Sequence, residues 1–273
     1  MLRVLAFVAP ILLVDWLLIV FVGPNSGSKW WKPILVGLVF GSMFGQTTLA
    51  ATAIVFLRAP LALRLPVSVF WVFMLGAGLA LNVGLNGGPS DMGFVFGALV
   101  FAQWLVLQLL LWPIRFAFAI KLSHIQSEPS VSDPSRHQFG IRQLMIVTAA
   151  VGVLLGVGRV MVPVLIDRLS VLRHDLPVHA FLVVAEVILT LPLVLAALLR
   201  RFTFVGTLLA LAFVAGATFV EVPLLQLLAG NNGIETSDFV GVNAVASALV
   251  TAALTAVRMN GYSLATSCGG AKN

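Results

Sequence analysis

Charged side chains are scarce in this chain of 273 residues: Asp, Glu, Lys and Arg together account for 10% of it, whereas hydrophobic residues account for 60%. Soluble domains carry about a quarter charged residues, so the composition excludes a soluble globular domain, a disordered chain and a nucleic-acid-binding domain. The formal net charge of +6 is spread between apolar segments, and we therefore attribute it to membrane topology rather than to a nucleic-acid partner. The mean hydropathy of +1.08 predicts an integral membrane protein.

Cysteine is limited to Cys268, which excludes an intrachain disulfide and a thiolate metal site. The chain also lacks the H-E-x-x-H, G-x-S-x-G and P-loop patterns of metalloproteases, serine hydrolases and nucleotide-binding proteins. His174, Asp175 and His179 straddle Pro177, which favours a simple connection over a zinc site. We predict no catalytic residues, no resident metal and no cofactor.

Eight apolar segments are long enough to cross a bilayer, whose hydrocarbon core of about 30 Å needs roughly 20 residues of helix. They fall at about 4–22, 33–57, 66–85, 93–114, 142–166, 177–199, 202–229 and 239–258. We treat the first as a span rather than a cleaved signal peptide, because Asp15 interrupts a long apolar run and no small-residue cleavage site follows before Lys29. The predicted fold is all-α, a polytopic membrane bundle of about eight transmembrane helices.

The basic residues predict the orientation of this bundle. With eight spans, one side holds both termini and eleven of the sixteen lysines and arginines, so the positive-inside rule places both termini in the cytoplasm, with the inner membrane as the location. Residues 121–140 are rich in Ser and Pro and predict a cytoplasmic linker, because they cannot bury a core. The expected organisation is a four-helix half at 1–120, this linker, a second four-helix half at 141–260 and a short cytoplasmic tail at 261–273.

Two short motifs flank the second half: Phe139-Gly140-Ile141-Arg142-Gln143-Leu144-Met145 after the linker, and Asn260-Gly261-Tyr262-Ser263-Leu264 after the last span. They resemble the F-S-[IL]-R-x-L-[LM] lead-in and the N-G-Y-R-L tail of uncharacterised multi-pass membrane proteins of planctomycete bacteria. Gly140 stands where serine is usual in those proteins, and Ser263 where arginine is usual. The resemblance implies no activity, because that family has no assigned function. We interpret Arg142 as an anchor to lipid phosphates at the start of a helix.

Small residues four apart predict helix contact faces in lipid, where close packing takes the place of hydrophobic expulsion. Four spans carry such rows: Gly37, Gly41, Gly45; Gly76, Ala80, Gly84; Thr148, Gly152, Gly156; and Ala244, Ala248, Ala252. Beside the last row runs a polar one, interpreted as packing with interhelical hydrogen bonds or, alternatively, as the lining of a polar path: Asn243, Ser247, Thr251, Thr255. Gln46, Gln103 and Gln108 are expected to form interhelical hydrogen bonds.

Four ionisable residues lie inside predicted spans, where the cost of burying them makes them candidates for a functional site: Asp15, Arg159, Glu186 and Glu221. At 1.5 Å per residue, all four are expected roughly 10–14 Å below the outer surface, in one layer. Three carboxyl groups against one guanidinium predict unequal protonation across this layer. His179, seven residues before Glu186 on the same helix face, is expected at its mouth. The layer predicts an ion or proton path with Arg159 as counter-charge; alternatively, Arg159 pairs with one glutamate and the charges are structural.

Three functional alternatives remain open. The first is proton- or cation-linked transport of a small solute, centred on Glu186 and Glu221. The second is a non-catalytic membrane scaffold or a subunit of a larger membrane complex. The third is an intramembrane serine protease, because Ser90 and His179 resemble the serine and histidine of rhomboid proteases, with Asp91 where that family has glycine. The expected partners are the lipid bilayer, a second copy or a membrane subunit, and an unidentified small-molecule substrate.

Overall fold

The computed structural model describes residues 32–57, 60–85, 90–117, 120–124, 176–198, 204–229, 236–259 and 262–266. The predicted spans at 4–22 and 142–166 lie outside the described residues. Asp15 and Arg159, two members of the predicted charge layer, lie outside them as well.

Long helices make up most of the described chain. In order they are α2 (Lys32–Val36), the π-helix η1 (Gly37–Gly41), α3 (Ser42–Phe56), α4 (Leu61–Leu85), α5 (Ser90–Ala117), α7 (Leu176–Leu198), α8 (Phe204–Ala229) and α9 (Thr236–Met259). Because α2, η1 and α3 are continuous, the described residues hold six helical stretches of 22 to 25 residues that are long and apolar enough to cross a membrane. They coincide within a few residues with six of the predicted spans, and they show the architecture of a multi-pass membrane protein.

The largest boundary difference is at α4. The sequence predicts a break that ends at Leu65, whereas the helix begins at Leu61 and contains Pro66. The carbonyl of Pro60 accepts hydrogen bonds from the N–H groups of Leu63 and Arg64, at 2.9 and 3.2 Å, and so starts the first turn. Pro66 lies just beyond that turn, where the missing N–H removes one hydrogen bond without ending the helix. Arg64 is therefore part of α4 rather than of a connecting loop.

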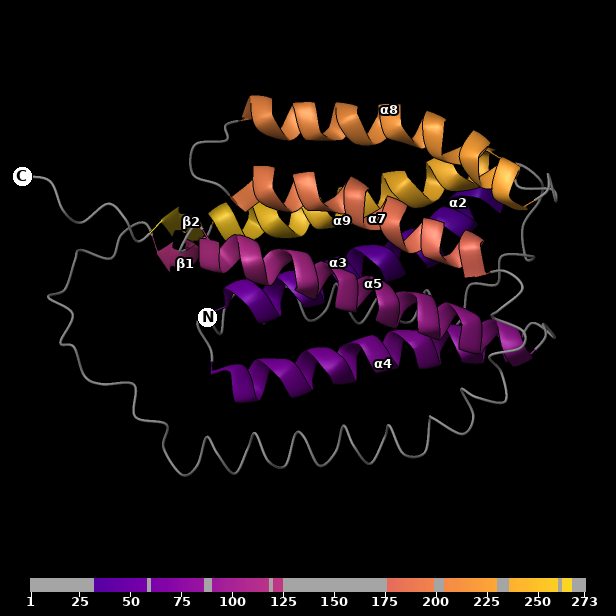
Figure 1. Cartoon of the computed structure of the whole chain (residues 1–273), viewed down its shortest axis with the longest axis horizontal. Helices are drawn as coiled ribbons and strands as arrows, with labels where there is room; N and C mark the ends of the chain where they lie inside the picture. The colour runs from indigo at the N-terminus through magenta and orange to yellow at the C-terminus, as the bar shows by residue number, and fades with distance from the viewer. Residues whose placement is uncertain are drawn as a thin grey trace, which may run out of the picture.

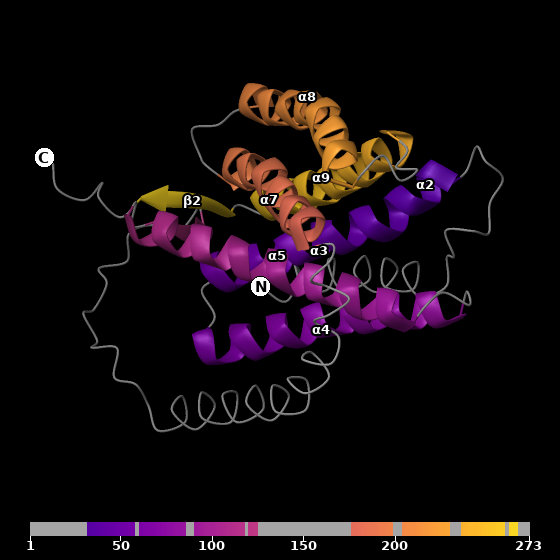
Figure 2. The same cartoon turned by 45° about the vertical axis from the view of Figure 1, so that its right-hand side comes forward.

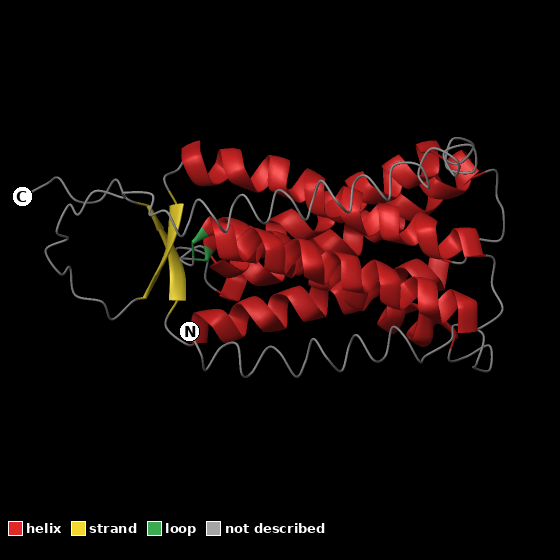
Figure 3. Cartoon of the chain, turned by 90° about the horizontal axis from the view of Figure 1, so that it is seen from below, coloured by secondary structure: helices red, strands yellow, loops and turns green. Residues whose placement is uncertain are grey.

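A two-stranded antiparallel ribbon forms from the start of the predicted linker and the start of the predicted tail. Strand β1 (Ile120–His124) pairs with β2 (Tyr262–Thr266), with Leu122 opposite Leu264. Figure 3 shows this ribbon at one end of the helix bundle. The predicted all-α fold therefore holds for the bundle but omits this pair of strands. Local sequence patterns did not indicate the ribbon, because its pairing joins residues far apart in the chain.

Helix α9 packs against both halves of the chain. It contacts α2, η1 and α3 on one side and α7 and α8 on the other, while α5 also contacts α7. In Figures 1 and 2, α4 and α8 lie on opposite outer sides of the bundle. The described parts of the two predicted halves therefore pack against each other.

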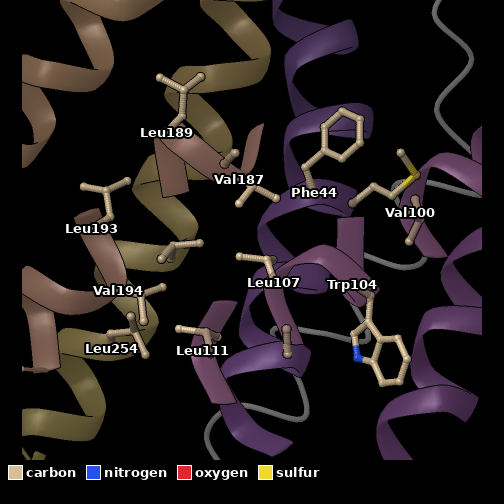
Figure 4. Packing of buried hydrophobic residues seen from close by; sticks show 14 of the residues in the cluster. Phe44, Val100, Trp104, Leu107, Leu111, Val187, Leu189, Leu193, Val194 and Leu254 are labelled. Carbon is tan, nitrogen blue, oxygen red and sulfur yellow. The ribbon is translucent and has the colours of Figure 1, made fainter. Parts of the chain in front are cut away.

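An apolar core runs between helices of the two halves. Leu107 and Leu111 of α5 and Val194 of α7 are completely buried and belong to one cluster that also includes Leu254 of α9. Figure 4 shows the two leucines of α5 on the side that faces Val194. This core fixes how α5, α7 and α9 lie relative to one another.

The glycine row of the first described span forms a close helix–helix contact, as predicted. A Cβ atom added to Gly37 would lie 2.7 Å from the backbone of Gly241 in α9, and one added to Gly41 would lie 2.5 Å from the carbonyl oxygen of Val242. A Cβ added to Gly45 would meet the Leu249 side chain at 3.0 Å. Since the contact advances in the same direction along both helices, α2–η1–α3 and α9 run parallel, and glycine is required where their backbones touch.

The other small-residue rows behave differently from one another. In α4, Gly76 and Ala80 contact Gly97 and Gly93 of α5, as predicted, but a Cβ at Gly84 would meet nothing within 4 Å. In α9 the prediction is wrong, because Ala244, Ala248 and Ala252 are exposed. That helix instead turns the neighbouring row inward, and Asn243 and Ser247 are buried. The row in 142–166 lies outside the described residues.

Candidate functional site

Two of the predicted charge-layer residues lie in the interior of the bundle. Glu186 in α7 is 3% exposed and Glu221 in α8 is 5% exposed. Asn243 of α9 is 3% exposed. We refer to Glu186, Glu221 and Asn243 as the three-helix polar cluster, because each comes from a different helix and these helices pack against one another.

The three residues lie at a similar depth. Glu186 lies ten residues after the start of α7, Glu221 eight residues before the end of α8, and Asn243 seven residues after the start of α9. Those three helix ends are on the same side of the bundle in Figure 1. At 1.5 Å per residue, the three side chains start about 10–15 Å from that side. This depth is close to the value expected from the sequence for the two glutamates.

Hydrogen bonds connect α8 to α9 within the cluster. The Asn243 side-chain amide donates to Glu221 Oε2 at 2.7 Å and to Thr218 Oγ1 at 2.9 Å. The hydroxyl of Thr218 donates to the carbonyl of Val214 at 2.8 Å, which fixes the direction of its lone pairs. Asn243 therefore bonds two residues of α8 through its amide group, one oxygen of Glu221 and the hydroxyl of Thr218.

The two carboxyl groups are close enough to interact electrostatically. Two carboxyl groups in a low-dielectric site carry one negative charge more easily than two, so a proton or a bound cation would stabilise the pair. On α7, the hydroxyl of Thr190 donates to the backbone carbonyl of Glu186 at 2.7 Å. That bond occupies the hydroxyl within α7 and leaves the Glu186 carboxyl group for other contacts.

The cluster also holds an oxygen acceptor with no hydrogen-bond partner among the described residues, Asn243 Oδ1, which is buried. Carboxylate and amide oxygens are the donors that hard cations prefer. In the part of the chain that the structure describes, no three His, Cys, Asp or Glu side chains gather into a metal site. The donors gathered in the described part of the cluster are oxygens, which suit a proton or a hard cation.

Each of the two helices that carry a glutamate also contains a proline. Pro223 follows Glu221 by two residues and Pro192 follows Glu186 by six, and both lie inside their helices. Proline has no N–H, so Pro223 donates nothing to the carbonyl of Phe219 and the helix is weakened near Glu221.

The remaining predicted site residues are placed as follows. His179 is the fourth residue of α7, is half-buried, and is separated from Glu186 by about two turns. Asp15 and Arg159 lie outside the described residues, so the predicted counter-charge stays a prediction. Ser90 begins α5, and its pairing with His179 in a rhomboid-like site also stays a prediction.

Asn243 has a larger role than its sequence pattern predicts. The polar row of α9 predicts packing with interhelical hydrogen bonds or a polar path, whereas Asn243 donates directly to Glu221. The signal available in the sequence was its depth, because Asn243 lies seven residues from the start of its helix and Glu221 lies eight from the end of the preceding one.

A second set of buried polar contacts joins α3, α4 and α5. Trp71 Nε1 donates to Gln46 Oε1 at 3.1 Å, Gln103 Nε2 to Thr48 Oγ1 at 3.3 Å, and Gln108 Nε2 to the carbonyl of Ala51 at 3.1 Å. The predicted interhelical role of the three glutamines is confirmed. These contacts contain no acid, and we assign them to helix association.

Comparisons with known proteins do not add to this picture. No protein-family model, no curated protein and no solved structure matches the chain. The Phe139–Met145 motif lies outside the described residues, and Tyr262 to Leu264 of the tail motif lie in β2.

Proposed function

We propose that this membrane protein carries out proton- or cation-linked transport of a small solute, and that Glu186 and Glu221 bind the proton or cation. The observation that carries this proposal is the pair of buried carboxyl groups on neighbouring helices, close enough to interact. Ionisable residues inside a membrane bundle are costly and are retained mainly where they serve a function.

The surrounding residues support a site that can be occupied and emptied. Asn243 holds one oxygen of Glu221 and offers its own free acceptor oxygen to an occupant. Pro223 weakens α8 beside the pair. A bound proton or cation would neutralise the pair, and its release would leave two acids that repel each other. The occupied and the empty site therefore favour different spacings of α7 and α8. Coupled transport requires such a pair of conformations, whose balance is shifted when the proton or cation binds.

We also propose that the protein lies in the inner membrane and that the end of the bundle with the ribbon faces the cytoplasm. Arg64, Arg115 and Arg258 lie at that end of their helices. The positive-inside rule assigns such an end to the cytoplasm. The three-helix polar cluster then lies closer to the opposite face.

Proton movement in proteoliposomes tests the proposal directly. The purified full-length chain is reconstituted with a trapped pH-sensitive dye, and inward gradients of H⁺, Na⁺ or K⁺ are imposed in turn. We expect faster proton movement than in empty liposomes under at least one gradient. Glu186→Gln should lower that rate at least tenfold, because an amide cannot release a proton. Glu128→Gln, a change in the predicted linker, is the matched control and should leave the rate unchanged.

A second measurement does not depend on knowing the solute. Infrared difference spectra of the protein in lipid nanodiscs, recorded between two pH values, show the C=O band of protonated buried carboxyl groups. We expect such a band to be lost in Glu186→Gln or Glu221→Gln and kept in Glu128→Gln. A wild-type protein with no titrating buried carboxyl band, and with the flux of empty liposomes, would contradict the proposal.

The scaffold alternative is favoured by one observation, the hydrogen bonds from Asn243 that tie α8 to α9. If the cluster is only structural, Glu221→Gln should lower the unfolding temperature while no flux exists to lose. If it is a transport site, Glu186→Gln should remove flux and leave the unfolding temperature within a few degrees of the wild type. Flux and unfolding temperature, each measured on both variants, therefore separate the alternatives.

A further inference from the structure

A pair of arginines lies at the C-terminal end of α3, away from the three-helix polar cluster. Arg64, in the first turn of α4, donates from Nη1 to the carbonyl of Ile54 and, at 3.4 Å, to that of Val55. Arg115, in the last turn of α5, donates from Nη1 to the carbonyl of Val55. The last carbonyls of a helix have no helical partner, so both guanidinium groups are held here by α3.

This arrangement leaves positive charge without compensation among the described residues. The guanidinium groups of Arg64 and Arg115 are close enough to repel each other. No carboxylate within the described ranges pairs with either of them, and Arg64 Nε is buried without a hydrogen-bond partner there. Glu186 and Glu221, the described acids that are buried, lie toward the other end of the bundle. A guanidinium group has five N–H donors, so the bonds from Nη1 to α3 leave further donors on each arginine for a phosphate group.

An apolar groove lies next to Arg115 of this pair. It runs along one face of α5, has a volume of about 490 Å³, and is lined by Leu105, Gln108, Leu109, Trp112, Pro113 and Phe116. Leu109 and Phe116 are 72% and 71% exposed. Trp112 lines the groove and also contacts Arg115, whose guanidinium carbon lies 5.2 Å from the centroid of the Trp112 ring.

We propose that this surface binds one anionic phospholipid, with the headgroup phosphate on Arg64 and Arg115 and an acyl chain in the groove of α5. Charge complementarity selects the headgroup, since the site presents two cations and no described acid. The groove selects a ligand with a hydrocarbon chain, because its walls are apolar apart from Gln108. Basic pockets between helices at the membrane–water interface commonly bind anionic lipid headgroups. Tryptophan is enriched at that level of the membrane. The proposal is independent of transport through Glu186 and Glu221.

Lipid retention measured by native mass spectrometry tests this proposal on the full-length wild-type protein. Phosphatidylglycerol and phosphatidylcholine with the same acyl chains are titrated in separate experiments. We expect phosphatidylglycerol to bind at least tenfold more tightly in the first binding step. A matched titration with inorganic phosphate separates a lipid site from a simple anion site, and we expect phosphate not to displace phosphatidylglycerol at equal concentration.

Variants locate the headgroup. Arg64→Gln and Arg115→Gln should each weaken phosphatidylglycerol binding about fivefold, since one basic residue near a membrane surface contributes on the order of 1 kcal/mol. Arg258→Gln is the control, because it removes one charge from the same end of the bundle but not from the groove. Equal binding of the two lipids by the wild type would overturn the proposal even if the variants failed to fold. Displacement of the lipid by inorganic phosphate, or a loss in Arg258→Gln as large as in Arg115→Gln, would overturn it as well.

Discussion

The contact between the glycine row and α9 gives a sharp prediction from geometry alone. Gly41→Ala would add a Cβ atom 2.5 Å from the carbonyl oxygen of Val242 and 2.8 Å from Cβ of Val245. An ordinary van der Waals contact is about 3.5 Å, so the two helices would have to separate by roughly 1 Å. Overpacking of this kind costs about 1–3 kcal/mol. At about 2–4 °C per kcal/mol for a chain of this size, the unfolding temperature should fall by roughly 2–12 °C.

Gly216→Ala is the matched control for this change. A Cβ at Gly216 would meet nothing within 4 Å, and the residue lies in the interior of α8. Alanine restricts the unfolded chain more than glycine, so this variant should be unchanged or more stable by up to about 1 kcal/mol. Thermal unfolding in detergent micelles, followed by circular dichroism, measures both. A Gly41→Ala protein as stable as Gly216→Ala would refute the assignment of this face as a close backbone contact.

Three further experiments test the packing and the polar contacts by equilibrium unfolding in micelles. Leu107→Ala removes a completely buried side chain and should cost about 2–5 kcal/mol, whereas Leu109→Ala, at a residue that is 72% exposed, should stay within about 0.5 kcal/mol of the wild type. A double-mutant cycle of Trp104→Phe with Ser68→Ala should give a coupling of about 0.6 kcal/mol, because the indole N–H donates to that hydroxyl at 2.9 Å; a coupling of zero would mean that the bond does not form in lipid or detergent. Asn243→Leu should cost about 1–3 kcal/mol, because it leaves the buried Glu221 oxygen without its donor, and a stability equal to that of the wild type would show that the bond does not hold α8 to α9.

Hydropathy alone was sufficient to predict the positions of the six described helices. The spans at 93–114 and 177–199 were predicted within a few residues of α5 and α7, since a run of about 20 apolar residues has few other solutions in lipid. The start of α4 was harder, because Pro66 and Arg64 both suggest a break, and only the hydrogen bonds to Pro60 show that the helix has already begun. The ribbon of β1 and β2 could not be predicted from local patterns, because each strand needs the other.

For the candidate site, the sequence indicated which acids were unusual and at what depth they lie. It did not indicate which neighbours they meet, because depth is one coordinate and the rotation of each helix about its axis is another. The row of Ala244, Ala248 and Ala252 shows this limit: it was expected at a contact and is exposed, whereas the adjacent row with Asn243 and Ser247 is buried. A step of one residue turns a helix by about 100°, so a small difference in rotation exchanges one face for another.

The sequence by itself therefore determined the membrane class, the six described helices and the depth of Glu186 and Glu221, because these follow from the length and the cost of burial of each segment alone. Only the tertiary structure decided that Asn243 holds Glu221, and that Arg64 and Arg115 converge on the end of α3. Those contacts depend on which helix faces meet. In a bundle whose helices are all apolar, that choice is made by close packing at sites such as Gly41 rather than by hydrophobicity.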